Sequence, residues 1–137
     1  MEATIVEFQS MGFVGKAGSG HQVVMDAKEE VGGGDGAPRP LELVLIGLGG
    51  CTGMDVSSIL KKMRIDYDRF EIAASAERAE EHPKTFTKIH MTYRFKGNDL
   101  DESKLKRAIE LSQDRYCSVS AMLKQAAEIT WSLEVTD

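Results

Sequence analysis

Alternating apolar and polar residues predict strands near the start of the chain. The segment TIVEFQ alternates, with Val6 and Phe8 on one side, and QVVMD has the pattern of a following strand. Between them, GKAGSGH supplies the glycines of a turn. Residues 4–26 are therefore predicted to be β-structure with turns. The glycine- and proline-rich segment 31–40 is predicted to be an internal loop, because the strands before it are too few to fold alone.

A second group of alternating segments lies in the middle and at the end of the chain. FEIAASAER and KIHMTYRFK are predicted to pair as strands across the hairpin loop AEEHPKTF. KIHMTYRFK turns its apolar residues inward and its charged residues outward, which is typical of an antiparallel sheet with one face in water. The inward residues are Ile89, Met91, Tyr93 and Phe95. The last segment, EITWSLEVT, also alternates and is predicted to be a strand.

From Leu41 to Met63 the apolar residues fall on nearly every face of a predicted helix. Pro40 suits its first turn, where a missing N–H costs nothing, and Lys61 and Lys62 suit its C-terminal end. A helix that is apolar all round must be buried all round. Because a chain of 137 residues has little material to wrap it, the pattern predicts an oligomer whose partner chains cover this helix.

Asp99 and Glu102 have the spacing of a capping box, which predicts the start of a second helix. Apolar residues at helical spacing continue it from Leu105 toward Cys117. Ser118 is predicted to cap a further short helix. The order of strands, long helix, two strands, helices and strand predicts an α+β fold with an antiparallel sheet, in one domain over residues 1–137.

Composition narrows the class of protein. With 42% hydrophobic and 28% charged residues and a net charge of −5, the chain has the composition of a soluble globular protein and lacks the basic surface that nucleic acid requires. The N-terminus has no basic and apolar segments of a secretory signal, and the longest apolar run, Leu43 to Leu48, is short for a membrane span. We expect a cytoplasmic protein with no membrane partner, in which cysteines are free or redox-cycling.

The glycine-rich stretch GLGGCTG does not match a nucleotide-binding motif. The third glycine of a dinucleotide fingerprint would fall at Thr52, and no P-loop is present. Gly49 and Gly53 lie on one helical face, which predicts the close approach of another backbone. The two cysteines and three histidines (His21, His82 and His90) show no zinc-ligand spacing, so we expect no metal site.

The residues alone leave two interpretations of Cys51 and Cys117. Both cysteines can be small buried residues on two helices, since free cysteine is among the most buried residue types. A redox pair instead requires disulfide geometry, one thiol with a lowered pKa, and access for a substrate.

The combination of PLELVLIGLGGCTGMDV, DRYCSVSAML and a short C-terminal strand resembles the OsmC/Ohr family. The resemblance covers nearly the whole chain, and GHQVVMD and SAERAEEHP look closest to the small YhfA-like branch. It implies an intertwined homodimer with long helices buried centrally and sheets outside. It also implies thiol peroxidase chemistry on organic hydroperoxides, with no metal, haem or flavin.

Carried onto this chain, the resemblance makes Cys51 the peroxidatic cysteine and Cys117 the resolving cysteine. Cys51 would become a sulfenic acid, Cys117 would condense with it to an intramolecular disulfide, and a dithiol or lipoylated-protein reductant would reset the pair.

The sequence departs from the family at the groups that assist the reactive cysteine. The family glutamate directly follows the helix-opening proline, whereas here that position is Leu41 and the glutamate is Glu42. One residue turns a side chain by about 100° around a helix. The only arginine in the preceding loop is Arg39, about 18 Å from Cys51 along a continuous helix, so it would act by folding back or from the partner subunit.

These departures favour a rival function, a non-peroxidatic binding protein of the same fold that holds a small hydrophobic ligand. The presence of both cysteines favours the peroxidase.

Overall fold

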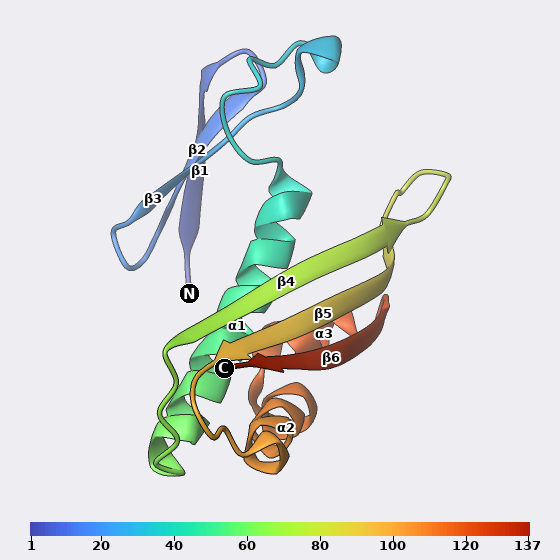
Figure 1. Cartoon of the computed structure of the whole chain (residues 1–137). Helices are drawn as coiled ribbons and strands as arrows, with labels where there is room; N and C mark the ends of the chain where they lie inside the picture. The colour runs from blue at the N-terminus through green and yellow to red at the C-terminus, as the bar shows by residue number, and fades with distance from the viewer. The chain divides into compact units, whose positions relative to one another are not determined.

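A computed structural model describes all 137 residues of the chain. The residues divide into two compact units, Met1–Val44 and Leu45–Asp137, each described here by itself. The colours of Figure 1 follow the chain from β1 to β6. The prediction of one domain over residues 1–137 stays a prediction.

The first unit is built on a three-stranded antiparallel sheet in the order β1-β2-β3. The strands are β1 (Ala3–Gln9), β2 (Gly12–Ala17) and β3 (Gln22–Met25). The alternation therefore located β1 and β3 correctly. The predicted turn was too long, because Gly15 and Lys16 lie in β2 and pair with Val23 and Gln22.

The loop after β3 is held by one carboxylate, and it contains a single short 3-10 turn, η1 (Glu29–Val31). Asp26 is buried and accepts hydrogen bonds from the backbone N–H groups of Ala27, Gly34 and Gly36. These bonds, that of Gly36 foremost, lower the pKa of Asp26. A side chain on Gly33 would collide with the Ala27 carbonyl, so this loop needs glycine for the close approach.

Helix α1 (Pro40–Lys62) confirms the predicted long helix. Its buried residues, Leu48, Thr52, Val56 and Leu60, recur every four positions and form one stripe. Within the single chain the helix is therefore not buried all round. Helix α1 is long and apolar enough to cross a membrane. The core helix of a soluble protein can have the same length and composition.

The glycines of α1 do not lie against another backbone of this chain. Gly47, Gly49 and Gly50 face open space, and the nearest atom to an added Cβ on Gly53 is Cδ1 of the Ile72 side chain, at 3.3 Å. The predicted close approach at Gly49 and Gly53 was therefore wrong for the isolated chain.

The second unit has a three-stranded sheet in the order β4-β5-β6. Its strands are β4 (Arg69–Arg78), β5 (Phe86–Lys96) and β6 (Glu128–Thr136). β4 and β5 form the predicted antiparallel hairpin, whereas β6 pairs parallel with β5. The predicted all-antiparallel sheet was wrong here, because the helices between β5 and β6 form a crossover that returns the chain to the same end of the sheet.

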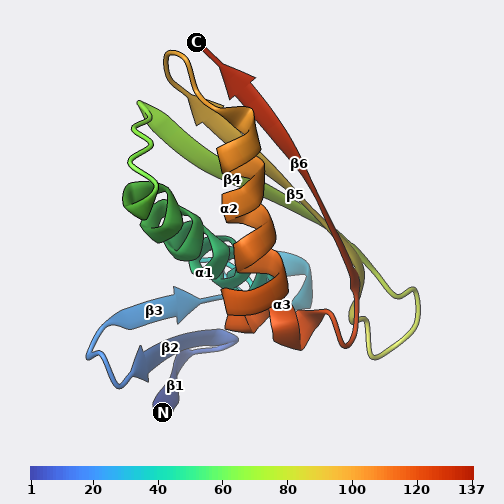
Figure 2. The same cartoon turned by 90° about the horizontal axis from the view of Figure 1, so that it is seen from below.

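The crossover consists of α2 (Glu102–Leu111), the single π-helical turn η2 (Ser112–Tyr116) and α3 (Ser118–Leu123). Figure 2 shows α1 and α2 on the same side of the β4-β5-β6 sheet. The predicted inward residues of β5 are all buried there, and α2 adds a buried stripe of Leu105, Ala108 and Ile109. This face of the sheet carries the core of the unit.

Both predicted helix caps were displaced in the structure. The N-cap of α2 is Asp101, whose carboxylate accepts from the N–H groups of Ser103 and Lys104. Asp99 instead has a left-handed backbone with φ of 51°. The N-cap of α3 is Cys117 rather than Ser118.

Candidate active site at the cysteine pair

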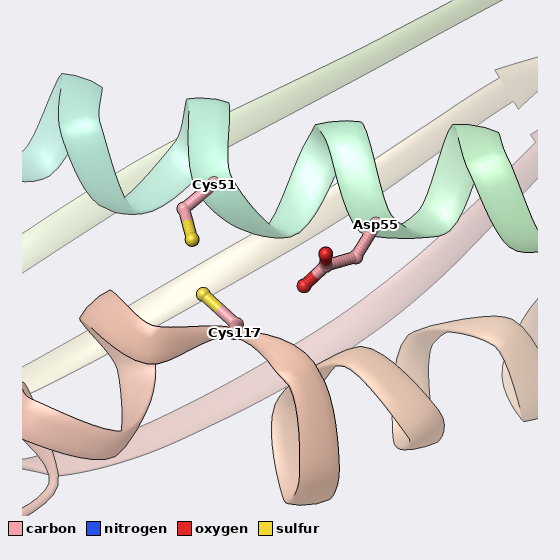
Figure 3. Close-up of side chains that lie close together, drawn as sticks. All are labelled: Cys51, Asp55 and Cys117. Atoms are coloured by element: carbon pink, nitrogen blue, oxygen red, sulfur yellow. The ribbon is translucent and has the colours of Figure 1, made fainter.

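The two cysteines meet inside the second unit, although they are distant in sequence. Both are free thiols, Cys51 half-buried and Cys117 buried. The two sulfurs and a carboxylate oxygen of Asp55 all lie within 4.8 Å of one another. Figure 3 shows Cys51 and Asp55 projecting from α1 toward Cys117. Cys51 and Asp55 share a helix face because they are four residues apart.

A local irregularity of the second helix positions Cys117. After Leu111 the helix widens into the π turn, and the Cys117 N–H bonds the Ser112 carbonyl at 2.8 Å. The backbone of Cys117 is then extended, and its sulfur accepts a hydrogen bond from the Ser120 N–H at 3.4 Å. The sulfur thus caps the short helix α3. Single π turns inside α-helices are frequent at functional sites.

A buried polar network surrounds the pair, with Thr52 at its centre. The Thr52 hydroxyl lies 2.8 Å from the Tyr93 hydroxyl and 2.8 Å from the Ser112 hydroxyl. The Gln113 amide donates to Thr52 and Tyr93, and its carbonyl accepts from the Ser120 hydroxyl. Every residue of this network is buried. A buried polar atom without a hydrogen bond would destabilise the fold, and these bonds give each group a partner.

The surroundings keep Cys117 protonated. Burial, with contributions from the neighbouring Cys51 and Asp55, raises the pKa of Cys117 to about 11. Burial likewise raises the pKa of Tyr93 to about 12. At neutral pH both groups are therefore uncharged, and Cys117 has the character of a thiol rather than a ready nucleophile.

Asp55 is the site residue that the sequence interpretation missed. The Ser112 hydroxyl donates to its carboxylate at 3.1 Å, and within residues 45–137 no lysine or arginine forms an ion pair with it. The sequence does place Asp55 one helical turn after Cys51. That spacing indicates a site residue only when Cys117 is known to lie near the same turn of α1.

Asp55 also opens onto a surface pocket of the same unit. The pocket is lined by Asp55, Ser58, Ile59, Lys62, Leu111 and Tyr116. Its walls are mainly apolar, and Lys62 places one positive charge among them. The carboxylate corner of the site is therefore reachable from solvent.

Arg39 and Glu42 have local partners in the first unit. The Arg39 guanidinium forms an ion pair with Asp35 and donates to the Ala37 carbonyl. The Glu42 carboxylate accepts from the Arg39 backbone N–H at 2.9 Å, as the third residue of a helix does in a capping box. This bond gives Glu42 a structural reason to occupy its position. A part for either residue in the chemistry of Cys51 stays a prediction.

Comparison with known proteins places this geometry in a family. The family model described as OsmC-like protein matches residues 32–132. Protein YhfA of Escherichia coli K12 is 42% identical over 135 residues, covering 98% of each chain. A hypothetical protein from Aquifex aeolicus is 30% identical with a TM-score of 0.82, covering 99% of this chain and 97% of that one.

A more distant solved structure shares the fold. It is an organic hydroperoxide resistance protein OsmC from Legionella pneumophila, 13% identical, with a TM-score of 0.73 over 97% of this chain and 95% of that one. The resemblance drawn from the two cysteine motifs is thus confirmed by three findings. They are the match to the family model, the YhfA relative of nearly equal length and the shared fold. The chain belongs to the OsmC family, and it is a homologue of YhfA along its whole length.

Proposed function

We propose that the protein is a cysteine-based thiol peroxidase that reduces organic hydroperoxides. The observation that carries the proposal is the meeting of the Cys51 and Cys117 sulfurs within 4.8 Å. Two free thiols so close can form a disulfide once their sulfurs approach to the bond length of about 2 Å. The hydroperoxide resistance name of the Legionella pneumophila protein supports the choice of substrate class.

The proposed reaction begins at the more accessible sulfur. The Cys51 thiolate attacks the distal oxygen of the hydroperoxide, the O–O bond breaks, and the alkoxide leaves as the alcohol after taking a proton. Cys51 is now a sulfenic acid. The Cys117 sulfur displaces its hydroxyl group, which leaves as water with the Cys117 proton. The two thiols have supplied two electrons, and a dithiol or lipoylated-protein reductant returns them.

The division of roles follows from the two environments. Cys51 is half-buried, whereas Cys117 is 2% exposed and holds its proton. A buried, protonated thiol is a poor first attacker, but it suits the second step, in which its proton leaves with water. In the pocket beside Asp55, Ile59 and Leu111 supply apolar surface that the organic part of a hydroperoxide could contact.

We further propose a cytoplasmic homodimer in which α1 is a core helix. Opposite its buried stripe, α1 carries an exposed stripe of Ile46, Gly50, Met54 and Ser58, which has no charge. Ile46 and Met54 are 60% and 77% exposed. Large apolar side chains alternating with small residues suit packing against a second helix, and a second copy of the chain would supply it.

The experiment is a thiol count after oxidation. Reduced, chelator-treated protein is mixed with excess cumene hydroperoxide, and free thiols are counted by alkylation and mass spectrometry. We expect both thiols to be lost, with the mass of one internal disulfide. Cys51→Ser should retain its remaining thiol, and Cys117→Ser should stop at a sulfenic acid that dimedone traps.

Ser75→Ala is the matched control, because Ser75 is exposed on the outer face of the β4-β5-β6 sheet, where it pairs with His90, and it contributes nothing to the proposed reaction. It should lose both thiols as the unmodified protein does. Intact thiols in the unmodified protein under excess hydroperoxide would rule out the peroxidase.

The second candidate is a non-peroxidatic binding protein for a small hydrophobic ligand. The raised pKa of Cys117 favours it, since a thiol that keeps its proton is a poor nucleophile. Unreacted thiols in the experiment above would support this function.

A further inference from the structure

The cysteine pair and Asp55 together have the composition of a metal-ligand set. Two thiols and a carboxylate converge from α1 and from the start of α3. Any three atoms within 4.8 Å of one another have a common point at most about 2.8 Å from each. Zinc–sulfur and zinc–oxygen bonds are about 2.3 Å and 2.0 Å long, so shifts of less than 1 Å would close the site on one ion.

We propose that reduced Cys51, Asp55 and Cys117 bind a thiophilic divalent cation, such as Zn²⁺, in competition with the Cys51–Cys117 disulfide. The competition rests on the function proposed above, whereas the binding does not. Linear motif spacing could not reveal this set, because only Cys51 and Asp55 are neighbours in sequence.

The charge of the site favours a cation. When both thiols lose their protons, two thiolates and a carboxylate lie together, and within residues 45–137 no lysine or arginine pairs with Asp55. Such a cluster is unfavourable without a compensating positive charge. Sulfur ligands select zinc-like ions over Mg²⁺ or Ca²⁺, which prefer oxygen.

Two of the three ligands, Asp55 and Cys117, are already oriented by hydrogen bonds. Ser112 donates to Asp55, and the Ser120 N–H donates to the Cys117 sulfur. Ser112 and Ser120 are in turn joined through Thr52 and Gln113. Metal sites depend on an outer layer of this kind, and losing one of its bonds weakens metal affinity by about 10- to 100-fold. The pocket lined by Asp55 opens the carboxylate side of the set to solvent.

Metal binding and disulfide formation exclude each other, because both use the same two sulfurs. The ion replaces two thiol protons, which pass to solvent. When a hydroperoxide oxidises the pair, two electrons leave the sulfurs, a disulfide forms, and the product alcohol and water take up two protons. The disulfide sulfurs are no longer thiolates, so the ion is released. Bound Zn²⁺ should accordingly slow the reaction with hydroperoxide.

The test uses Co²⁺ as a coloured substitute for Zn²⁺ on the full-length reduced protein. We expect one Co²⁺ per chain, with thiolate-to-cobalt charge-transfer absorption that Zn²⁺ removes by displacement. Cys51→Ser and Cys117→Ser should each weaken this absorption strongly. Asp55→Asn should lower the affinity by at least the roughly 10-fold typical of losing a supporting bond.

Two controls separate this site from surface binding. A variant with His21, His82 and His90 all changed to Ala should keep the charge-transfer band, and Glu110→Gln should keep the affinity. Cys117→Ser retains an oxygen able to cap α3, so its fold is preserved for the comparison. Absence of the band in the reduced protein, or bands in the two cysteine variants as strong as in the unmodified protein, would overturn the metal site.

The thiol count in chelator-treated protein is independent of the cobalt titration. If the thiols react with hydroperoxide but the protein binds no cobalt, the metal site is refuted and the peroxidase is not. If the protein binds cobalt but its thiols do not react, the peroxidase is refuted and the metal site is not.

Discussion

Cys117 combines two roles in one side chain. Its sulfur accepts a hydrogen bond from the Ser120 N–H in the first turn of α3 and lies close to the Cys51 sulfur. The Cys51–Cys117 pairing could be predicted only from the family resemblance, because spacing does not show that two helical residues meet. Asp55 was missed for a related reason, since the π turn that brings Cys117 to it has no pattern of its own in the sequence.

The raised pKa of Cys117 predicts how stability changes in alkali. A group whose folded pKa is above its unfolded value of about 8.5 contributes stability below that value and loses it as pH rises toward 11. We expect the free energy of unfolding, measured by guanidinium titration, to fall between pH 8 and 10. Cys117→Ser should fall less.

Tyr93 predicts a second fall in the free energy of unfolding, at higher pH. Its folded pKa of about 12 lies above the ordinary value of about 10, so its contribution is lost mainly above pH 10. Tyr93→Phe should remove that later decline. Identical pH profiles for the unmodified protein and Cys117→Ser between pH 8 and 10 would contradict the buried-thiol interpretation.

Among the elements, α2 shows how a capping prediction can be correct in kind and wrong in place. The capping-box spacing predicted the cap at Asp99, and the structure places it two residues later, at Asp101. The choice depends on the backbone after β5, which is left-handed at Asp99 and therefore cannot start the helix there. Local pattern predicts that a helix begins, and tertiary structure decides at which residue.

The cap assignment gives a stability prediction. Asp101→Ala removes the acceptor for two N–H groups and should cost about 1 kcal/mol in the free energy of unfolding. Asp99→Asn is the matched control, because asparagine tolerates the left-handed backbone, and it should change stability by less than about 0.5 kcal/mol. Urea denaturation measures both. A larger cost for Asp99→Asn would restore the original assignment.

The strand pattern predicted five of the six strands, and only β2 was taken for part of a turn. The faces of β5 were predicted correctly residue by residue, because period-two alternation fixes which side chains are buried. The direction of β6 was not predictable in this way. Alternation is the same for a parallel and an antiparallel neighbour, and the crossover through α2 and α3 decides between them.

For the whole molecule, the exposed stripe on α1 predicts assembly. Light scattering at micromolar concentration should give about twice the chain mass of 15.1 kDa. Met54→Lys places a charge in the middle of the apolar stripe and should shift the protein toward monomer, because burying an unpaired charge is costly. Glu110→Lys, on the exposed face of α2, is the control and should remain dimeric. A monomeric unmodified protein would refute the homodimer.

The parallel pairing of β6 also bears on how the β4-β5-β6 sheet is completed during synthesis. β5 is made before α2, η2 and α3, so the edge of β5 that receives β6 stays unpaired until the crossover and β6 have been synthesised. Cys117 lies in the same crossover, so the nascent chain carries one cysteine from the synthesis of Cys51 until that of Cys117, 66 residues later. The internal disulfide proposed above can therefore form only after most of the crossover has been made.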